Sequence, residues 1–140
     1  MKIYADNAAT TRLSDTALAA MTPCFQEIYG NPSSLHTPGQ LAAEKLAAAR
    51  EVFARNLHAD PREITFTSGG SEADNQALRS AAALGAKRGK RHIVSTKFEH
   101  HAVLHTLQAL EREGYEVTLL DIPPDGVVTA EQVRSAIRPD

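Results

Sequence analysis

The stretch ITFTSGGSEADN, residues 64–75, decides the fold of this sequence. Its first four residues, Ile64 to Thr67, are β-branched or aromatic and predict a short strand. The small residues from Ser68 to Ser71 predict a tight turn. A helix is predicted from about Glu72 to Ala86, and Ser71 with Asp74 resembles a capping box at its start. The side chains expected on the inward face of this helix are Ala77, Leu78, Ala81 and Leu84.

The alternation of strand and helix continues toward the C-terminus. Strands are predicted at His92–Ser95 and Tyr115–Leu120, and a helix between them at Glu99–Glu113, closed by Gly114. Inward positions in that helix are Val103, Leu107 and Leu110. After the turn Pro123–Gly126, a last helix capped by Thr129 and Gln132 ends near Ile137. Such alternation predicts an α/β fold of three layers with a mostly parallel sheet. Because a strand is due where the sequence stops, we expect an incomplete domain.

Two further helices are predicted before residue 64. The first follows the N-cap Ser14 and runs to about Gln26, with a kink or an early end at Pro23. A breaker-rich loop, Tyr29–Ser34, precedes the second helix, which covers Gly39–Leu57 and ends before Asp60-Pro61. One face of that helix carries Ala42, Leu46, Ala49, Phe53 and Leu57. Residues before position 13 are expected to be extended.

Composition narrows the class of protein. The 140 residues carry a net charge of -2, and 42% of them are hydrophobic, which is ordinary for one soluble domain. No basic excess indicates nucleic acid, no apolar run is long enough for a membrane span, and we expect no secretory signal. A lone cysteine, Cys24, cannot form an internal disulfide, so the expected compartment is the cytoplasm. Cys24 is expected to be a buried thiol in a helix rather than a nucleophile.

Ligands of open α/β sheets bind at the carboxyl ends of the strands. The loop Thr67–Ser71 follows a strand and opens a helix, so its N–H groups and the helix dipole could hold a phosphate, with the Ser71 hydroxyl as a donor. A plain turn with no ligand is the alternative. The sequence has neither GxGxxG nor GxxxxGK[ST], which disfavours a dinucleotide or nucleoside-triphosphate site.

The loop Ser95–His101 follows the next strand. A histidine there could stack on a planar ligand or carry a proton. His101 and His105 are four residues apart on one helix face and could share a metal ion, but Ala102 breaks the HExxH pattern and no further ligand is near. Exposed helix-face histidines are the alternative, and we expect no metal. The loop Asn31–His36 could be a wall of an active site or a surface connection.

Four segments together resemble NifS-like cysteine desulfurases, which belong to the class-V aminotransferase group of fold-type-I pyridoxal-phosphate enzymes. They match this family in order and spacing, and the resemblance covers essentially the whole chain. It implies a short piece of the small domain at residues 1–13 and the first part of the cofactor-binding large domain at residues 14–140. The segments are Tyr4–Thr11, Gly30–His36, Thr67–Asn75 and Glu99–Val103.

The resemblance implies roles for three residues. Gly70 and Ser71 correspond to the small residue and the hydroxyl residue that bind the phosphate of pyridoxal 5'-phosphate; the family more often has threonine where this chain has Ser71. His100 corresponds to the catalytic histidine that stacks on the cofactor ring and helps to move protons. Asn7–Thr11 resembles the segment that approaches the substrate.

The resemblance also implies a reaction that this chain cannot complete alone. In the family, L-cysteine is converted to L-alanine, and its sulfur passes through an enzyme persulfide to a sulfur acceptor or an iron–sulfur scaffold protein. The family's Schiff-base lysine lies in a Ser-x-His-Lys segment, and no lysine of this chain is in such a segment. Its persulfide cysteine and its His-x-Asp-Ala segment are likewise unmatched. We therefore expect no sulfide release from this chain incubated with cofactor and cysteine.

Three alternatives stay open from the sequence. The chain could come from a selenocysteine lyase or from a class-V transaminase, because the residues that separate these enzymes mostly lie beyond its range. It could instead be a non-catalytic domain that binds a phosphate ligand or a partner. The complete desulfurase is expected to be a homodimer.

Overall fold

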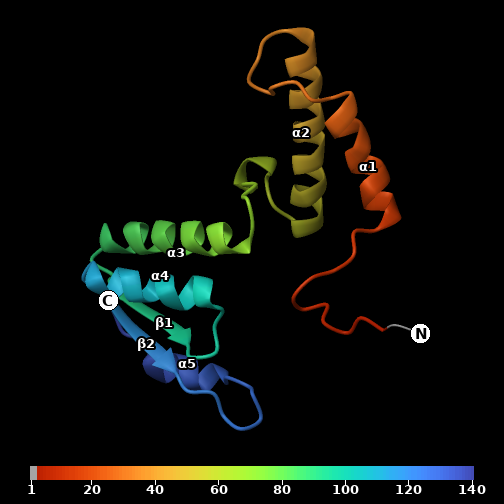
Figure 1. The fold of residues 1–140 in the computed structure, drawn as a ribbon. Helices are drawn as coiled ribbons and strands as arrows, with labels where there is room; N and C mark the ends of the chain where they lie inside the picture. The colour runs from red at the N-terminus through yellow and green to blue at the C-terminus, as the bar shows by residue number, and fades with distance from the viewer. Residues whose placement is uncertain (1–2) are drawn as a thin grey trace. The chain divides into compact units, whose positions relative to one another are not determined.

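The computed structural model describes residues 3–140, which form two compact units (Figure 1). The first unit extends to Thr65 and the second runs from Phe66 to Asp140. Met1 and Lys2 lie outside the described residues. The expectation that residues 1–13 belong to a small domain stays a prediction.

The first unit is helical. Helix α1 covers Asp15–Gln26, helix α2 covers Thr37–Leu57, and a short 3-10 helix, η1, covers Pro61–Glu63. Ser14 caps α1 as predicted, because its side chain accepts a hydrogen bond from the Ala17 amide at 3.1 Å. Pro23 lies inside α1 without ending it. Before α1, the predicted extended entry is interrupted by a turn, in which the Asp6 carbonyl accepts from two following amides.

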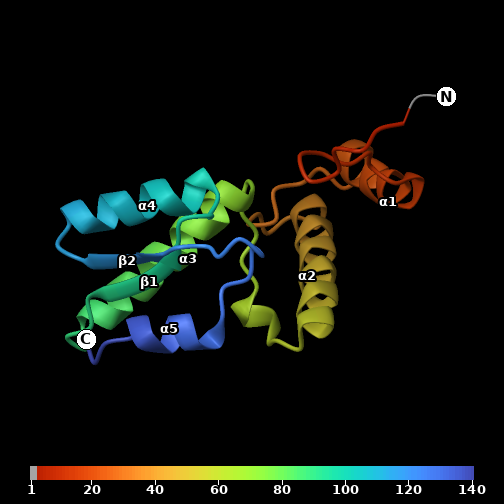
Figure 2. The same cartoon turned by 90° about the horizontal axis from the view of Figure 1, so that it is seen from below.

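The second unit contains the α/β arrangement. Its elements in order are α3 (Gly70–Ala86), β1 (His92–Thr96), α4 (His101–Arg112), β2 (Glu116–Leu120) and α5 (Ala130–Ala136). Strands β1 and β2 are parallel, with His92 opposite Glu116 and Thr96 opposite Leu120. In Figures 1 and 2, α3 and α4 lie on one side of the strands and α5 on the other. This is the predicted three-layer, parallel α/β fold.

The predicted strand Ile64–Thr67 is wrong, because the described sheet contains only β1 and β2. A strand requires a neighbouring strand to pair its N–H and C=O groups. The Ile64 carbonyl instead accepts a hydrogen bond from the Arg50 guanidinium. The residue types correctly predicted an extended backbone at Ile64, which has extended dihedral angles. They could not show whether a neighbouring strand would pair with it.

The core of the second unit lies under α4. Leu107 and Leu110 are almost fully buried, at 1% and 2% exposure, as their spacing predicts. Helix α3 packs mainly against α4, so its buried position is Ala82. The predicted inward face of α3 is therefore largely wrong: Leu78 is half-buried, while Ala77, Ala81 and Leu84 are exposed.

The apolar face predicted for α2 is also mostly exposed. Leu46, Phe53 and Leu57 are exposed, and the buried side chain of this helix is Ala54. Helix α2 packs against η1, the element that follows its C-terminal end, where Ala54 lies.

Candidate functional site

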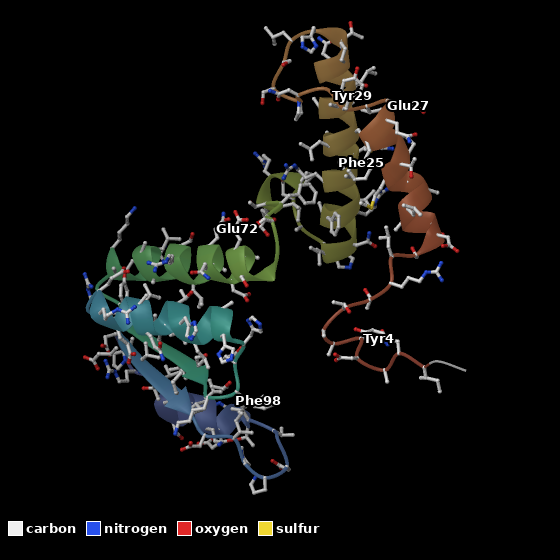
Figure 3. All side chains as sticks on the ribbon, in the orientation of Figure 1. Tyr4, Phe25, Glu27, Tyr29, Glu72 and Phe98 are labelled. Carbon is white, nitrogen blue, oxygen red and sulfur yellow. The ribbon has the colours of Figure 1, made fainter. Side chains whose placement is uncertain are left out.

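Helix α3 begins two residues earlier than the sequence predicts, at Gly70 rather than at about Glu72. Its N-cap is Gly69, so Ser71 is already the second helical residue and does not act as the cap. The Glu72 carboxylate takes over part of the capping, because it accepts from the Ser68 amide at 2.7 Å and from the Ser68 hydroxyl at 2.5 Å. These bonds, the hydroxyl first, lower the pKa of Glu72. Figure 3 shows Glu72 at this end of α3.

The start of α3 has the properties of an anion site. N–H groups in the first turn of a helix have no acceptor within the helix, and the helix dipole is positive there. No atom lies within 4 Å of where a Cβ would be on Gly69 or Gly70, so a ligand could approach the backbone closely. The exposed Ser71 side chain adds a hydroxyl donor at the same end.

Helix α4 begins at His101, two residues after the predicted start at Glu99, and the candidate site residue His100 directly precedes it. His100 is its N-cap, and the ring nitrogen Nδ1 accepts a hydrogen bond from the Ala102 amide at 3.0 Å. A ring nitrogen that accepts carries no proton, so neutral His100 holds its proton on Nε2. The rest of the ring is exposed, which leaves Nε2 available to a ligand.

Ser71 and His100 line one pocket of about 380 Å³ between α3 and α4. Sequence reasoning expected both at the carboxyl side of the sheet, and the structure brings them to a common surface. The pocket is also lined by Asn75, Arg79, His101 and His105.

Sequence reasoning assigned no role to Asn75 and Arg79. They follow Ser71 by four and eight residues on the same face of α3, and that spacing could have indicated them. Arg79 is held by the Glu113 carboxylate at 3.0 Å, across from α4. Thr106, a buried polar residue of α4 that also lines the pocket, carries no sequence signal at all.

The remaining candidates lie as follows. His101 and His105 are exposed on α4, as expected for helix-face histidines, and their rings stack with centroids 5.4 Å apart. No group of three or more His, Cys, Asp or Glu residues suited to a metal ion occurs between residues 3 and 140. Cys24 is half-buried in α1, where its thiol faces the Ala20 carbonyl.

The loop Asn31–His36 folds tightly onto the start of α2. Asn31 accepts from the Ser33 amide through its side chain, and His36 caps α2 by accepting from the Gly39 amide at 3.2 Å. A Cβ on Gly39 would meet the Ser34 carbonyl oxygen at 2.4 Å, so this close approach requires glycine. The loop therefore has a structural role in the first unit.

None of the helices in the described part of the chain combines the length and apolar character needed to span a membrane.

At the carboxyl ends of the two strands, Lys97 and Asp121 form an exposed ion pair at 2.6 Å. The Lys97 ammonium group is thus paired with a carboxylate at this edge of the sheet. Exposed ion pairs of this kind contribute little to the stability of the fold.

Known proteins with similar sequences show the family to which this chain belongs. The family model for aminotransferase class-V matches residues 3–140. The chain is 45% identical over 139 residues to the putative cysteine desulfurase IscS 1 of Bacillus subtilis, covering 99% of this chain and 36% of that protein. It is 46% identical over 136 residues to the cysteine desulfurase IscS of Clostridium botulinum strain Kyoto, covering 97% of this chain and 34% of that protein.

Solved structures give the same result. A NifS-like protein superposes with a TM-score of 0.93 at 39% identity, covering all of this chain and 38% of that one. A structure described as SspA in complex with cysteine superposes with a TM-score of 0.86 at 37% identity, covering 94% and 38%. The chain thus spans little more than a third of the length of these relatives. With a family model that matches nearly every residue, the chain belongs to the class-V aminotransferase family.

Proposed function

We propose that this chain is the N-terminal part of a pyridoxal-phosphate-dependent cysteine desulfurase and that it supplies one side of the cofactor site. The observation that carries the proposal is that Ser71 and His100, from the starts of two adjacent helices, line the same pocket. Family membership and the names of the similar proteins support the assignment.

The residues present fit the cofactor phosphate. The first turn of α3 offers N–H groups, a positive dipole end and the Ser71 hydroxyl, and Gly70 leaves open space for an oxygen atom to approach. The pocket volume, about 380 Å³, falls in the range of small-molecule sites, roughly 300–1,000 Å³. Gly70 and Ser71 would therefore bind the phosphate.

His100 would cover the ring of the cofactor. When bound, pyridoxal phosphate supplies an electron sink for a negative charge that develops on the substrate. The contribution of His100 is to place Nε2 where a proton can be held or transferred, because Nδ1 is occupied by the cap of α4. His100 is thus both a structural cap and the proposed catalytic residue.

The proposed substrate is L-cysteine, with L-alanine as the product and the sulfur passed to an acceptor or iron–sulfur scaffold protein. A structural relative was solved in complex with cysteine, which supports this substrate class. We further propose a cytoplasmic homodimer as the complete enzyme. No lysine of this chain lies in a Ser-x-His-Lys segment, so we expect the chain alone to release no sulfide.

Binding of pyridoxamine 5'-phosphate tests the proposal. This ligand keeps the ring and the phosphate but has no aldehyde to react with surface lysines, and its fluorescence reports binding directly. Because a hydrogen bond to a charged group contributes about 1.5–3 kcal/mol, we expect it to bind at least about tenfold tighter than pyridoxamine, which lacks the phosphate.

Variants on α3 locate the phosphate. Ser71→Ala should weaken binding of the phosphate ester by about tenfold and leave pyridoxamine binding unchanged. Ser80→Ala is the matched control, since Ser80 is an exposed serine of the same helix outside the pocket. Equal affinity for the two ligands, or equal effects of the two variants, would contradict the proposal.

A further inference from the structure

A series of hydrogen bonds, joined through the backbone of Ala102, links Ser71 on α3 to His100 on α4. It begins at the Ser71 carbonyl, which accepts from the Asn75 side-chain amide at 2.8 Å. The other end of the Asn75 side chain, Oδ1, accepts from the Thr106 hydroxyl at 2.7 Å. Asn75 is therefore the point at which the phosphate-binding turn of α3 is joined to α4.

The series continues on α4. The Thr106 hydroxyl also lies 2.8 Å from the Ala102 carbonyl, so its single proton is shared between two acceptors. The amide of Ala102 in turn donates to His100 Nδ1 at 3.0 Å. Ala102 thus connects Thr106 to the imidazole ring of His100.

The middle of this series of hydrogen bonds is shielded from water. Thr106 is only 3% exposed, and no buried side-chain N or O atom among the described residues lacks a partner. A polar group that is buried is costly to leave unpaired, so the Thr106 hydroxyl stays bonded within this cluster, to Asn75 Oδ1 and the Ala102 carbonyl. The ends of the series, at Ser71 and His100, are exposed and face the pocket.

We propose that Asn75 and Thr106 are positioning residues that fix the phosphate-binding turn at Ser71 relative to the imidazole of His100. In this proposal, which rests on the proposed function, neither residue touches the reacting atoms. They hold the two ends of the site at the separation that one ligand can bridge, and they keep the His100 proton on Nε2.

A ligand-free measurement tests the link itself. Thr106→Val keeps the shape of the side chain and removes its hydroxyl, and Asn75→Leu removes the other partner. In both variants we expect the Ala102 amide to exchange with solvent about fivefold faster or more. The nitrogen chemical shifts of His100 should move from those of a single tautomer toward an average of two.

Two matched variants separate positioning from general stability. Thr106→Ser restores the hydroxyl and should return both signals to the wild-type values. Thr118→Val removes a hydroxyl that lies 2.8 Å from His92 Nε2 between the two strands, in the same unit but outside the pocket. It should leave Ala102 and His100 unchanged even if it lowers the unfolding temperature.

Ligand binding then distinguishes the two proposals. We expect Thr106→Val to weaken pyridoxamine 5'-phosphate about tenfold, with Thr106→Ser within about twofold of wild type. Because the two residues form one link, Asn75→Leu combined with Thr106→Val should cost no more than either change alone.

Each result has one meaning. Wild-type Ala102 exchange and His100 shifts in Thr106→Val would overturn the positioning role, whatever the ligand does. Absence of saturable binding in the wild-type chain would instead refute the proposed function, while the ligand-free signals would still decide whether the link exists.

Discussion

Replacement of His100 by two different residues separates its structural role from its ligand-binding role. His100→Ala removes the acceptor for the Ala102 amide as well as the ring, whereas asparagine is among the best N-cap residues and can keep the acceptor. Loss of an N-cap bond costs about 1 kcal/mol, so His100→Ala should lower the free energy of unfolding by that amount. His100→Asn should stay within a few tenths of a kcal/mol of wild type.

Both variants lose the aromatic face that would cover the cofactor ring. Stacking between rings contributes about 1 kcal/mol beyond area burial, so both should bind pyridoxamine 5'-phosphate roughly fivefold more weakly than wild type. Urea denaturation followed by circular dichroism measures the first effect, and fluorescence titration measures the second. The expected pattern is one stable variant and one destabilised variant with the same loss of affinity.

The control for this pair is His58→Asn in the first unit. His58 adopts a left-handed conformation with φ 54°, which asparagine tolerates well, so neither stability nor affinity should change. Wild-type affinity of His100→Asn would refute the assignment of the ring to the site. Wild-type stability of His100→Ala would refute the assignment of Nδ1 to the helix cap.

Two further predictions concern stability. Leu107→Ala should destabilise the second unit by about 3–5 kcal/mol in urea denaturation, because Leu107 is 1% exposed in the core, while Leu84→Ala, at 59% exposure, should change it by no more than about 0.5 kcal/mol. Similar effects of the two variants would place the core elsewhere. The pKa of Glu72 is lowered in the folded chain, so its bonds to Ser68 stabilise the fold above the ordinary glutamate pKa and are lost as the pH falls through the folded value. The difference in the free energy of unfolding between wild type and Glu72→Gln should therefore become smaller as the pH is lowered from 6 to 3. A difference that does not change with pH would contradict this role of Glu72.

Much of the local structure could be predicted from the sequence. The cap Ser14, the capping box of Thr129 with Gln132 and the closing glycine Gly114 all occur where expected. Each depends on contacts between residues at most a few positions apart, and such contacts form whatever the rest of the chain does. The buried stripe of α4 at Leu107 and Leu110 is confirmed for a similar reason, because helical periodicity decides which side chains share a face.

Predictions that needed a distant partner were less successful. The segment Ile64–Thr67 has the composition of a strand but no strand beside it in the described sheet. The predicted inward faces of α2 and α3 follow helical spacing, yet the buried residues are Ala54 and Ala82. Periodicity identifies a face, and only the neighbouring elements decide which face is covered.

The candidate site likewise has features that the sequence could predict and features that depend on packing. The sequence by itself indicated the two loops, the prediction that Gly70 and Ser71 bind a phosphate, and the family to which the motifs belong. Only the tertiary structure decided that Ser71 and His100 meet at one pocket, and that Asn75 and Thr106 join them by a hydrogen bond of 2.7 Å across 31 residues of sequence. The physical reason is that turns and caps are fixed by neighbours along the chain, whereas a shared pocket depends on how α3 and α4 pack, and that packing is the sum of many contacts that no single segment encodes.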